Sequence, residues 1–184
     1  MSTSQIHQVT FSAPVLETER LILRAPCEAD FAAEAEFFTS DASHFVGGPK
    51  RPDETWRSIA GMIGHWVMRG YGFWALEEKA TGNYVGRTGL WFPDGWPERE
   101  IGWSLMPGHT GKGYATEAGR AARAYAYDVL GWPTAISLID PNNKASEAVA
   151  TRLGATFEKT YDHPEFGTMY IWRHPGPDAV KEDA

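Results

Sequence analysis

The stretch that decides the fold is Met106-Pro-Gly-His-Thr-Gly-Lys-Gly-Tyr-Ala-Thr-Glu117. A predicted strand stops at Pro107, because proline has no N–H to donate to a strand ladder. A loop with three glycines follows, and an alanine-rich helical pattern begins at Tyr114. The first turn of a helix leaves backbone N–H groups unpaired and carries the positive end of the helix dipole. The stretch therefore predicts an anion-binding loop, and phosphate is the common ligand of such loops.

The residues of this loop separate three kinds of phosphate site. A nucleotide P-loop requires Gly-x-x-x-x-Gly-Lys-Ser/Thr, but Met106 stands in its first position and Gly113 in its last. A dinucleotide-binding loop requires a third glycine where Thr116 stands, and it follows the first strand of a parallel unit. The preceding strands instead have the pattern of an antiparallel meander, so neither of these two sites is predicted.

The third kind of site fits. The segment Thr110-Gly-Lys-Gly-Tyr-Ala115 resembles the acetyl-CoA loop of the GNAT N-acetyltransferase superfamily, Gln/Arg-x-x-Gly-x-Gly/Ala. Three further stretches are similar to its RimJ/RimL-like branch, which acetylates ribosomal-protein N-termini: Thr18-Glu-Arg-Leu-Ile-Leu-Arg24, Glu100-Ile-Gly-Trp103 and Asn143-Lys-Ala-Ser146 with Arg152-Leu-Gly154. The resemblance covers residues 16–173 in order. Thr110 departs from the family's Gln or Arg, and we expect this to tune cofactor binding, because backbone amides do most of the work.

Periodicity along the chain predicts one domain. Strands are predicted at 20–24, 72–78, 84–92, 100–106, 134–139, 156–161 and 167–173, and helices at 28–40, 53–70, 114–130 and 143–153. In the first helix we expect one apolar stripe of Phe31, Ala35 and Phe38. The expected fold is α+β and of the GNAT type, with a central mixed, mostly antiparallel sheet flanked by helices in the order β-α-α-β-β-β-α-β-α-β-β. We expect a flexible lead-in at 1–14, an acetyltransferase domain at 15–174 and a polar tail at 175–184.

Composition limits the partners. The 184 residues carry a net charge of −7, so a general attraction to nucleic acid or to an anionic membrane is not expected. We find no signal peptide and no stretch of about 20 apolar residues, which favours a cytoplasmic protein. Cys27 is the only cysteine, which excludes an intrachain disulfide and a cysteine-based zinc site. It lies far in sequence from the glycine loop, so no covalent acetyl-enzyme is expected. The chain is expected to be a monomer or a homodimer.

The resemblance implies that acetyl-CoA is the co-substrate and that no metal is needed. Its diphosphate would be received by the backbone amides of Gly111, Lys112, Gly113, Tyr114 and Ala115. Its pantetheine arm would lie along the strand near Leu105, next to the predicted strand at 134–139. The family asparagine that contacts this arm corresponds to Asn143, although an asparagine at a helix start is also an ordinary N-cap.

Transfer of an acetyl group to an amine needs a base for the amine and a proton for the departing thiolate. The family serine that protonates the thiolate corresponds to Ser146, and a thiol of pKa about 8.5 needs only modest help. Glu100 is the predicted base, directly or through a water, because strand parity puts Gly102 and Ser104 on its face and leaves room beside the carboxylate. A solvated strand-edge glutamate is the plain alternative, and Glu165 is the rival base.

Tryptophan is unusually frequent, with eight in the chain and six between positions 56 and 103. Trp74, Trp91 and Trp103 lie in three successive predicted strands. Either they form one aromatic wall where the acceptor binds or they belong to the core, and we expect at least one of them in the core and at least one in the pocket.

The expected function is transfer of an acetyl group from acetyl-CoA to a primary amine, by direct attack in a ternary complex. The amine belongs either to a protein or peptide N-terminus or to a small molecule, and the acidic composition suits a cationic acceptor. One alternative is a detoxifying enzyme that acetylates antibiotic-like or polyamine-like small molecules. Another is a non-catalytic, CoA-binding regulatory module.

Overall fold

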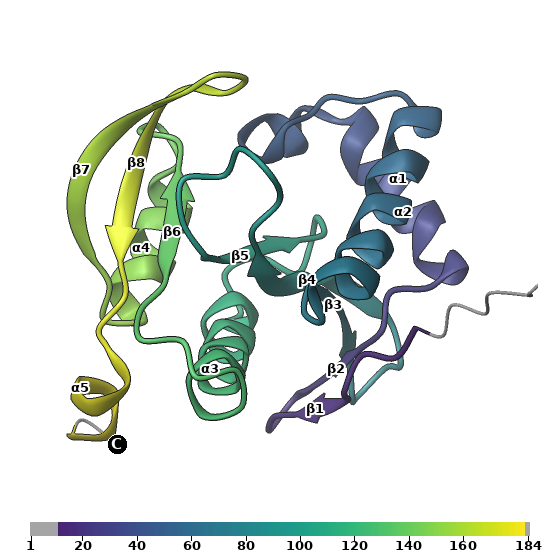
Figure 1. Cartoon of the computed structure of the whole chain (residues 1–184). Helices are drawn as coiled ribbons and strands as arrows, with labels where there is room; N and C mark the ends of the chain where they lie inside the picture. Colours follow the sequence, from purple (N-terminus) through teal and green to yellow (C-terminus); the bar gives the residue numbers. More distant parts are fainter. Residues whose placement is uncertain (1–10, 183–184) are drawn as a thin grey trace, which may run out of the picture.

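The computed structural model describes residues 11–182, and an eight-stranded mixed sheet forms its centre (Figure 1). The strands are β1 (Leu16–Glu17), β2 (Leu21–Arg24), β3 (Phe73–Glu78), β4 (Tyr84–Trp91), β5 (Glu100–Leu105), β6 (Ile136–Ile139), β7 (Thr156–His163) and β8 (Gly167–Arg173). Their order across the sheet is β1-β2-β3-β4-β5-β6-β8-β7. Among the strands of the described residues, only β5 and β6 pair in parallel. The predicted α+β class with a mixed, mostly antiparallel sheet is confirmed.

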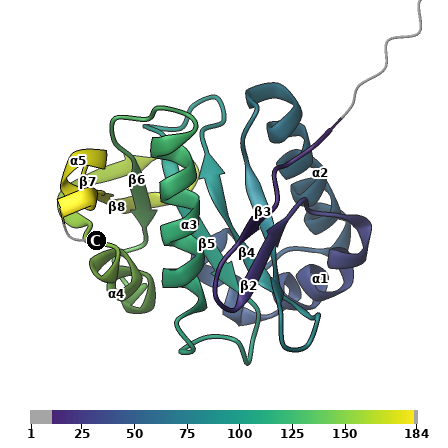
Figure 2. The same ribbon diagram turned by 90° about the horizontal axis from the view of Figure 1, so that it is seen from below.

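Helices cover both faces of the sheet. They are α1 (Phe31–Thr39), α2 (Pro52–Arg69), α3 (Tyr114–Asp128), α4 (Lys144–Arg152) and α5 (Pro177–Glu182), with short 3-10 helices η1 (Glu28–Asp30) and η2 (Asp41–Val46). Figure 2 shows α3 crossing the sheet over β4 and β5. Helices α1 and α2 pack on each other, and Glu34 of α1 pairs with Arg87 on the sheet face opposite α3. The sheet therefore has one face for α3 and α4 and another that is left partly open beside α1.

The core lies between the sheet and α3. Leu76, Leu90 and Ile101 are fully buried there, and alanines let α3 approach the strands closely. Trp74 is also fully buried, edge-on to Tyr125 of α3, and its indole N–H donates to the carbonyl oxygen of Pro14 at 2.8 Å. Trp74 therefore belongs to the core and not to a substrate wall.

The ends of the chain and helix α1 differ from the sequence-based expectation. Residues 1–10, most of the expected lead-in, lie outside the described residues, while Phe11 packs against the core. The expected tail contains α5. In α1 the buried residues are Glu34, Phe37 and Phe38, whereas Phe31 and Ala35 are only half-buried. Glu34 replaces them on the inner face because Arg87 and Tyr84 bind its carboxylate.

Strands β5 and β6 separate soon after they meet. Their register contains one pair, Glu100 with Ile136. The next amide of β6 on the side of β5 is that of Leu138. Its N–H donates to the side chain of Glu100 at 3.2 Å instead of to the backbone of β5. The two central strands therefore diverge, and the opening between them begins at Glu100.

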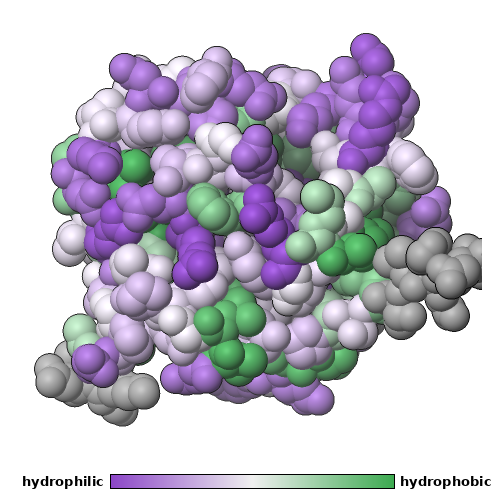
Figure 3. Space-filling view, viewed as in Figure 1, coloured by the Kyte–Doolittle hydropathy of each residue, from purple (hydrophilic) through white to green (hydrophobic). Residues whose placement is uncertain are grey.

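Hydrophilic residues dominate the face of the molecule in Figure 3, where hydrophobic residues form small separate groups. No helix within residues 11–182 is both long enough and apolar enough to cross a membrane.

Candidate active site

The glycine-rich loop turns sharply before α3. Gly108, Gly111 and Gly113 have φ angles of +82°, +76° and +85°. Side chains disfavour this left-handed conformation, so glycine is required at these turns. Gly113 is the residue that precedes α3 and caps it. The loop therefore delivers the chain directly into the first helical turn.

The amides of this loop are available to a ligand. The first helical hydrogen bond runs from Glu117 N–H to the carbonyl of Gly113 at 3.0 Å. Within residues 11–182, the hydrogen bonds include none from the N–H groups of Gly111, Gly113, Tyr114 or Ala115 to a protein acceptor. These four amides lie at the positive end of the α3 dipole, which is the arrangement that binds a diphosphate.

Arg20, which is distant from the loop in the sequence, holds it in place. Its Nη1 donates to the carbonyl oxygen of Lys112 at 2.8 Å, and its guanidinium lies 4.7 Å from the ring centre of Tyr114. Its Nε donates to Glu117 at 2.7 Å, and the hydroxyl of Thr18 donates to the same carboxylate at 2.6 Å. Two stretches that the sequence shows far apart are therefore one structural unit.

The opening between β5 and β6 runs toward this loop. Ile136 N–H binds the carbonyl of Arg99, and Met106 N–H binds Val85 of β4. Because backbone groups alternate along a strand, those of Leu105 face the β6 side, where β6 has already diverged. These backbone groups lie at the edge where the pantetheine arm is expected, and no strand of the described residues pairs with that edge there.

Glu100 lies inside a cavity of about 1010 Å³ on this side of the sheet. Its side chain accepts hydrogen bonds from the indole N–H of Trp96 at 2.6 Å and from Leu138 N–H at 3.2 Å. Burial raises the pKa of Glu100 to about 7, although both hydrogen bonds favour the charged form. A carboxylate with this pKa is half ionised at neutral pH and suits proton transfer there. Glu100 is therefore not a solvated edge residue.

Sequence reasoning missed Trp96 as the partner of Glu100. Trp96 stands in Asp94-Gly-Trp-Pro97, where the glycine and the proline are typical of a turn, and a turn does not show where the side chain points. Gly102 and Ser104 line the same cavity as Glu100, as expected, although the ring of Phe73 takes the space directly above Gly102, where a Cβ would lie 3.0 Å from it. Ser104, on the same face, is buried at the cavity wall, and its hydroxyl has no hydrogen-bond partner among the described residues.

Ser146 and Asn143 both line the cavity at the start of α4. The side-chain oxygen of Asn143 accepts Ser146 N–H at 3.1 Å, so Asn143 is the N-cap of α4. The hydroxyl oxygen of Ser146 accepts the indole N–H of Trp103 at 3.3 Å. This leaves the hydroxyl proton of Ser146 to be donated elsewhere.

Comparison with known proteins identifies the family. The family model of the acetyltransferase (GNAT) domain matches residues 20–156. The chain belongs to the GNAT acetyltransferase family. It is 33% identical over 155 residues to the Bacillus subtilis (strain 168) protein YkkB. The matched residues make up 79% of this chain and 87% of YkkB. An acetyltransferase of Agrobacterium tumefaciens is similar in structure with a TM-score of 0.83 and 36% identity, over 93% of this chain and 99% of that one.

A more distant structure bears on the branch of the family. The ribosomal-protein-S5-alanine acetyltransferase of Vibrio fischeri has a TM-score of 0.69, at 16% identity over 90% of this chain and 98% of its own. Identity this low shows the GNAT fold and not the acceptor. Because the chain belongs to the GNAT family, the protein is an acetyl-CoA-dependent acetyltransferase. The family alone leaves the acceptor open.

The remaining predicted residues of this GNAT protein divide between cavity and core. Trp91 and Trp103 line the cavity, whereas Trp74 does not. Glu165, the rival base, also lines the cavity but is exposed in the turn between β7 and β8. The described residues hold no group of His, Cys, Asp and Glu side chains that could bind a metal ion.

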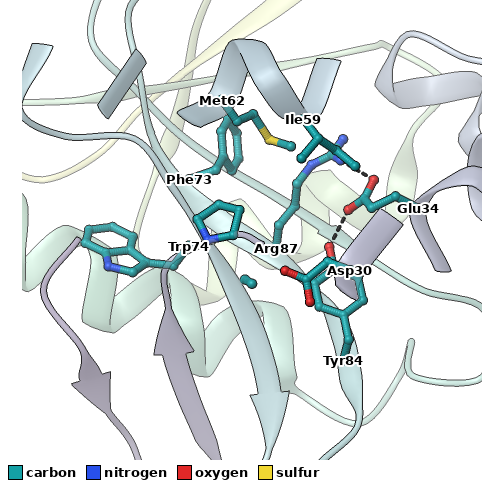
Figure 4. A pocket seen from close by; sticks show the side chains of 10 residues that line it. Asp30, Glu34, Ile59, Met62, Phe73, Trp74, Tyr84 and Arg87 are labelled. Carbon is teal, nitrogen blue, oxygen red and sulfur yellow. Dashed lines mark hydrogen bonds and ion pairs between the residues drawn. The ribbon is translucent and has the colours of Figure 1, made fainter. Parts of the chain in front are cut away.

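Arg87 forms a second charged group at the cavity wall. Figure 4 shows its guanidinium pointing to Glu34, which also accepts the hydroxyl of Tyr84. The neighbouring cavity there has a volume of only about 10 Å³. Since buried Glu34 neutralises Arg87, whose side chain is only 11% exposed, this group holds α1 on the sheet beside the site.

Proposed function

We propose that this GNAT enzyme transfers the acetyl group of acetyl-CoA to a primary amine in a ternary complex, with Glu100 as the base. The observation that carries the proposal is the position of Glu100. It is a buried carboxylate with a pKa of about 7, located where β5 and β6 separate and facing the large cavity. An amine in that cavity meets a proton acceptor at the same opening where the donor arm fits.

The amides of 111–115 would hold the diphosphate, with the charge of Lys112 beside them, and the edge of β5 at Leu105 would bind the pantetheine arm. Asn143 would hold the start of α4 against the end of that arm. Bound acetyl-CoA supplies a thioester: the amine nitrogen bonds to its carbonyl carbon, and the carbon–sulfur bond breaks. The residues of the chain orient this exchange and move its protons.

The proton balance assigns a task to each side chain. For a neutral amine, the nitrogen loses one proton to Glu100, directly or through a water, and the leaving sulfur gains one from Ser146. The proton held by Glu100 returns to Ser146 through solvent. Trp103 supports this direction, because its N–H occupies the oxygen of Ser146 and leaves the hydroxyl proton to donate.

Two acceptor classes are compatible with these residues. The RimJ/RimL-like motifs support a peptide N-terminus. A small molecule is supported by the close approach of two segments at the rim of the cavity, the chain at Gly47 and the β7–β8 turn. They are so near that a Cβ on Gly47 would lie 3.6 Å from the ring of Phe166. A cavity narrowed at its rim by this contact admits a small amine more easily than a folded protein, so we favour the small-molecule class.

Release of CoA thiol with acetyl-CoA and a panel of small amines and short peptides tests the proposal. The wild type should release thiol with at least one amine. Glu100→Gln should lower kcat by about 100-fold or more, which is the scale of general base catalysis. Glu36→Gln alters an exposed glutamate on α1 and should keep the wild-type rate. A protein that binds CoA but releases thiol with no amine would be the regulatory module instead.

A further inference from the structure

Glu100 lies between two tryptophans. Trp91 is its direct partner in the β4–β5 ladder, and side chains that face each other in this way are about 5 Å apart. Trp96 donates to the carboxylate of Glu100 from the loop before β5. An amine that gives its proton to Glu100 therefore lies against aromatic rings on both sides.

Trp91 is held rigidly. Its ring stacks on that of His65, with centres 4.4 Å apart and planes 23° apart. His65 Nε2 accepts Phe92 N–H at 3.1 Å, so Nδ1 carries the proton and donates to the carbonyl of Tyr71 at 2.7 Å. Burial lowers the pKa of His65, which keeps the ring neutral. The indole of Trp91 is therefore a fixed wall of the cavity.

Aromatic rings also form the rim of the cavity. Phe45 of η2 and Phe166 of the β7–β8 turn both line it, and each is 39% exposed. Figure 1 shows these two segments approaching each other at the top of the molecule. The ring of His163 stacks on Phe166, with centres 4.6 Å apart, and fixes it in place. Two flat apolar side chains therefore stand over the entrance to Glu100.

The charges of the cavity are unevenly placed. Arg87 faces Ser104, which lies four residues beyond Glu100 on β5. At about 3.3 Å per residue, Arg87 is therefore about 13 Å along the sheet from Glu100. Arg87 is neutralised by Glu34, and the charge of Lys50, whose ammonium also binds the hydroxyl of Ser58 at 3.2 Å, is offset in part by Glu165. Four carboxylates line the same cavity: Asp94, Glu100, Asp140 and Glu165. The surroundings of Glu100 thus favour a cation flanked by aromatic faces.

We infer that the acceptor is a primary amine on a short carbon chain that ends in an aromatic or similarly flat apolar group. Its nitrogen binds at Glu100, and its ring lies among Trp91, Phe45 and Phe166. Tryptophan and phenylalanine faces attract an ammonium group and also stack on a ring, so the two ends of one small molecule are recognised together. The inference rests on the proposed function and names the substrate class for it.

Thiol release from saturating acetyl-CoA by the full chain tests the inference, with 2-phenylethylamine, n-propylamine and spermidine as probes. We expect kcat/KM for 2-phenylethylamine to exceed the other two by about tenfold or more, the scale of discrimination by an apolar pocket. Comparable kcat/KM values for all three amines would overturn the inference and leave the proposed function standing. No turnover of any of the three would overturn the inference, and the proposed function would then be overturned only if the wider panel of amines and short peptides also released no thiol.

Two variants locate the preference. Phe45→Leu and Trp91→Leu should each lower the ratio of kcat/KM for 2-phenylethylamine to that for n-propylamine by about fivefold. Phe45 is partly exposed at the rim, so its variant tests the inference even where Trp91→Leu loses stability. Trp56→Leu is the control, because Trp56 is 50% exposed on α2 and is not among the residues of the cavity wall. An unchanged ratio in Phe45→Leu would contradict the inference.

Discussion

The guanidinium of Arg20 and the carboxylate of Glu117 lie 2.6 Å apart, although 97 residues separate them in the chain. Arg20 stands directly before β2, and Glu117 lies in the first turn of α3. The same arginine holds the carbonyl of Lys112. The conformation of the anion-binding loop is therefore set by a residue outside it, and a loop fixed before binding loses less entropy on binding.

Arg20→Ala should weaken binding of acetyl-CoA while the chemical step remains. We expect KM for acetyl-CoA to rise by about fivefold with little change in kcat, because the loop loses its fixed shape. Arg57→Ala is the matched control, since Arg57 pairs only with exposed Asp53 on α2. An Arg20→Ala enzyme with the wild-type KM would show that the loop keeps its shape without this contact.

Gly113→Ala should damage both the loop and the fold. A Cβ at this position would lie 3.3 Å from Arg20 Nη2, and φ is +85°. We expect a loss of about 1–2 kcal/mol in the free energy of unfolding, the usual cost of a side chain in the left-handed region, together with weaker CoA binding by calorimetry. Gly131→Ala, at φ +66° with open space around it, should lose similar stability but keep CoA affinity. Equal CoA affinities in the two variants would contradict the assignment of the loop.

The raised pKa of Glu100 makes the stability of the fold depend on pH. The folded state holds this proton up to about pH 7, whereas an ordinary glutamate releases it near 4.5. Stability from this group is therefore full below pH 4.5 and is lost as pH rises to 7, by about 3 kcal/mol. Glu100→Gln does not titrate, so urea unfolding should show it gaining stability relative to the wild type between pH 5 and pH 8. A constant difference across that range would mean that the carboxylate titrates normally.

Ser146→Ala and Asn143→Ala separate proton donation from helix capping. Ser146→Ala should lower kcat by about tenfold, since a thiolate is a fair leaving group without help, and should leave the free energy of unfolding close to that of the wild type. Asn143→Ala removes the N-cap of α4 and should cost about 1 kcal/mol of stability. Steady-state kinetics and urea unfolding measure both quantities. A Ser146→Ala enzyme with full kcat would remove this serine from the mechanism.

Much of the fold could be predicted because local patterns decide it. The strand at 167–173 was placed at the observed bounds, and the helices that follow the glycine loop and Asn143 begin within one residue of the prediction. These elements have strong periodicity and clear stop signals. The short strand β1 and helix α5 lack such signals, and contacts with the rest of the domain decide them.

The site could be predicted only where backbone groups form it. The glycine loop could be recognised, because glycine marks the turns that the loop requires. Trp96 was missed although it stands only four residues before Glu100, because a tryptophan in a turn does not show which way its N–H points. Phe73 was missed because it meets Gly102, two residues after Glu100, from a different strand. Glu34 was missed for the same reason, since its burial depends on Arg87, 53 residues away. Side-chain partners of this kind leave no periodic trace in the sequence.

The central claim, that Glu100 takes the proton of the amine, is tested most directly by the pH dependence of kcat at saturating acetyl-CoA and amine. The account predicts that wild-type kcat rises with pH and levels off above a midpoint near 7. In Trp96→Phe the midpoint should move to higher pH, because the lost N–H donor favoured the ionised carboxylate. In Glu100→Gln this midpoint should be absent. A midpoint near 7 that persists in Glu100→Gln would contradict the account.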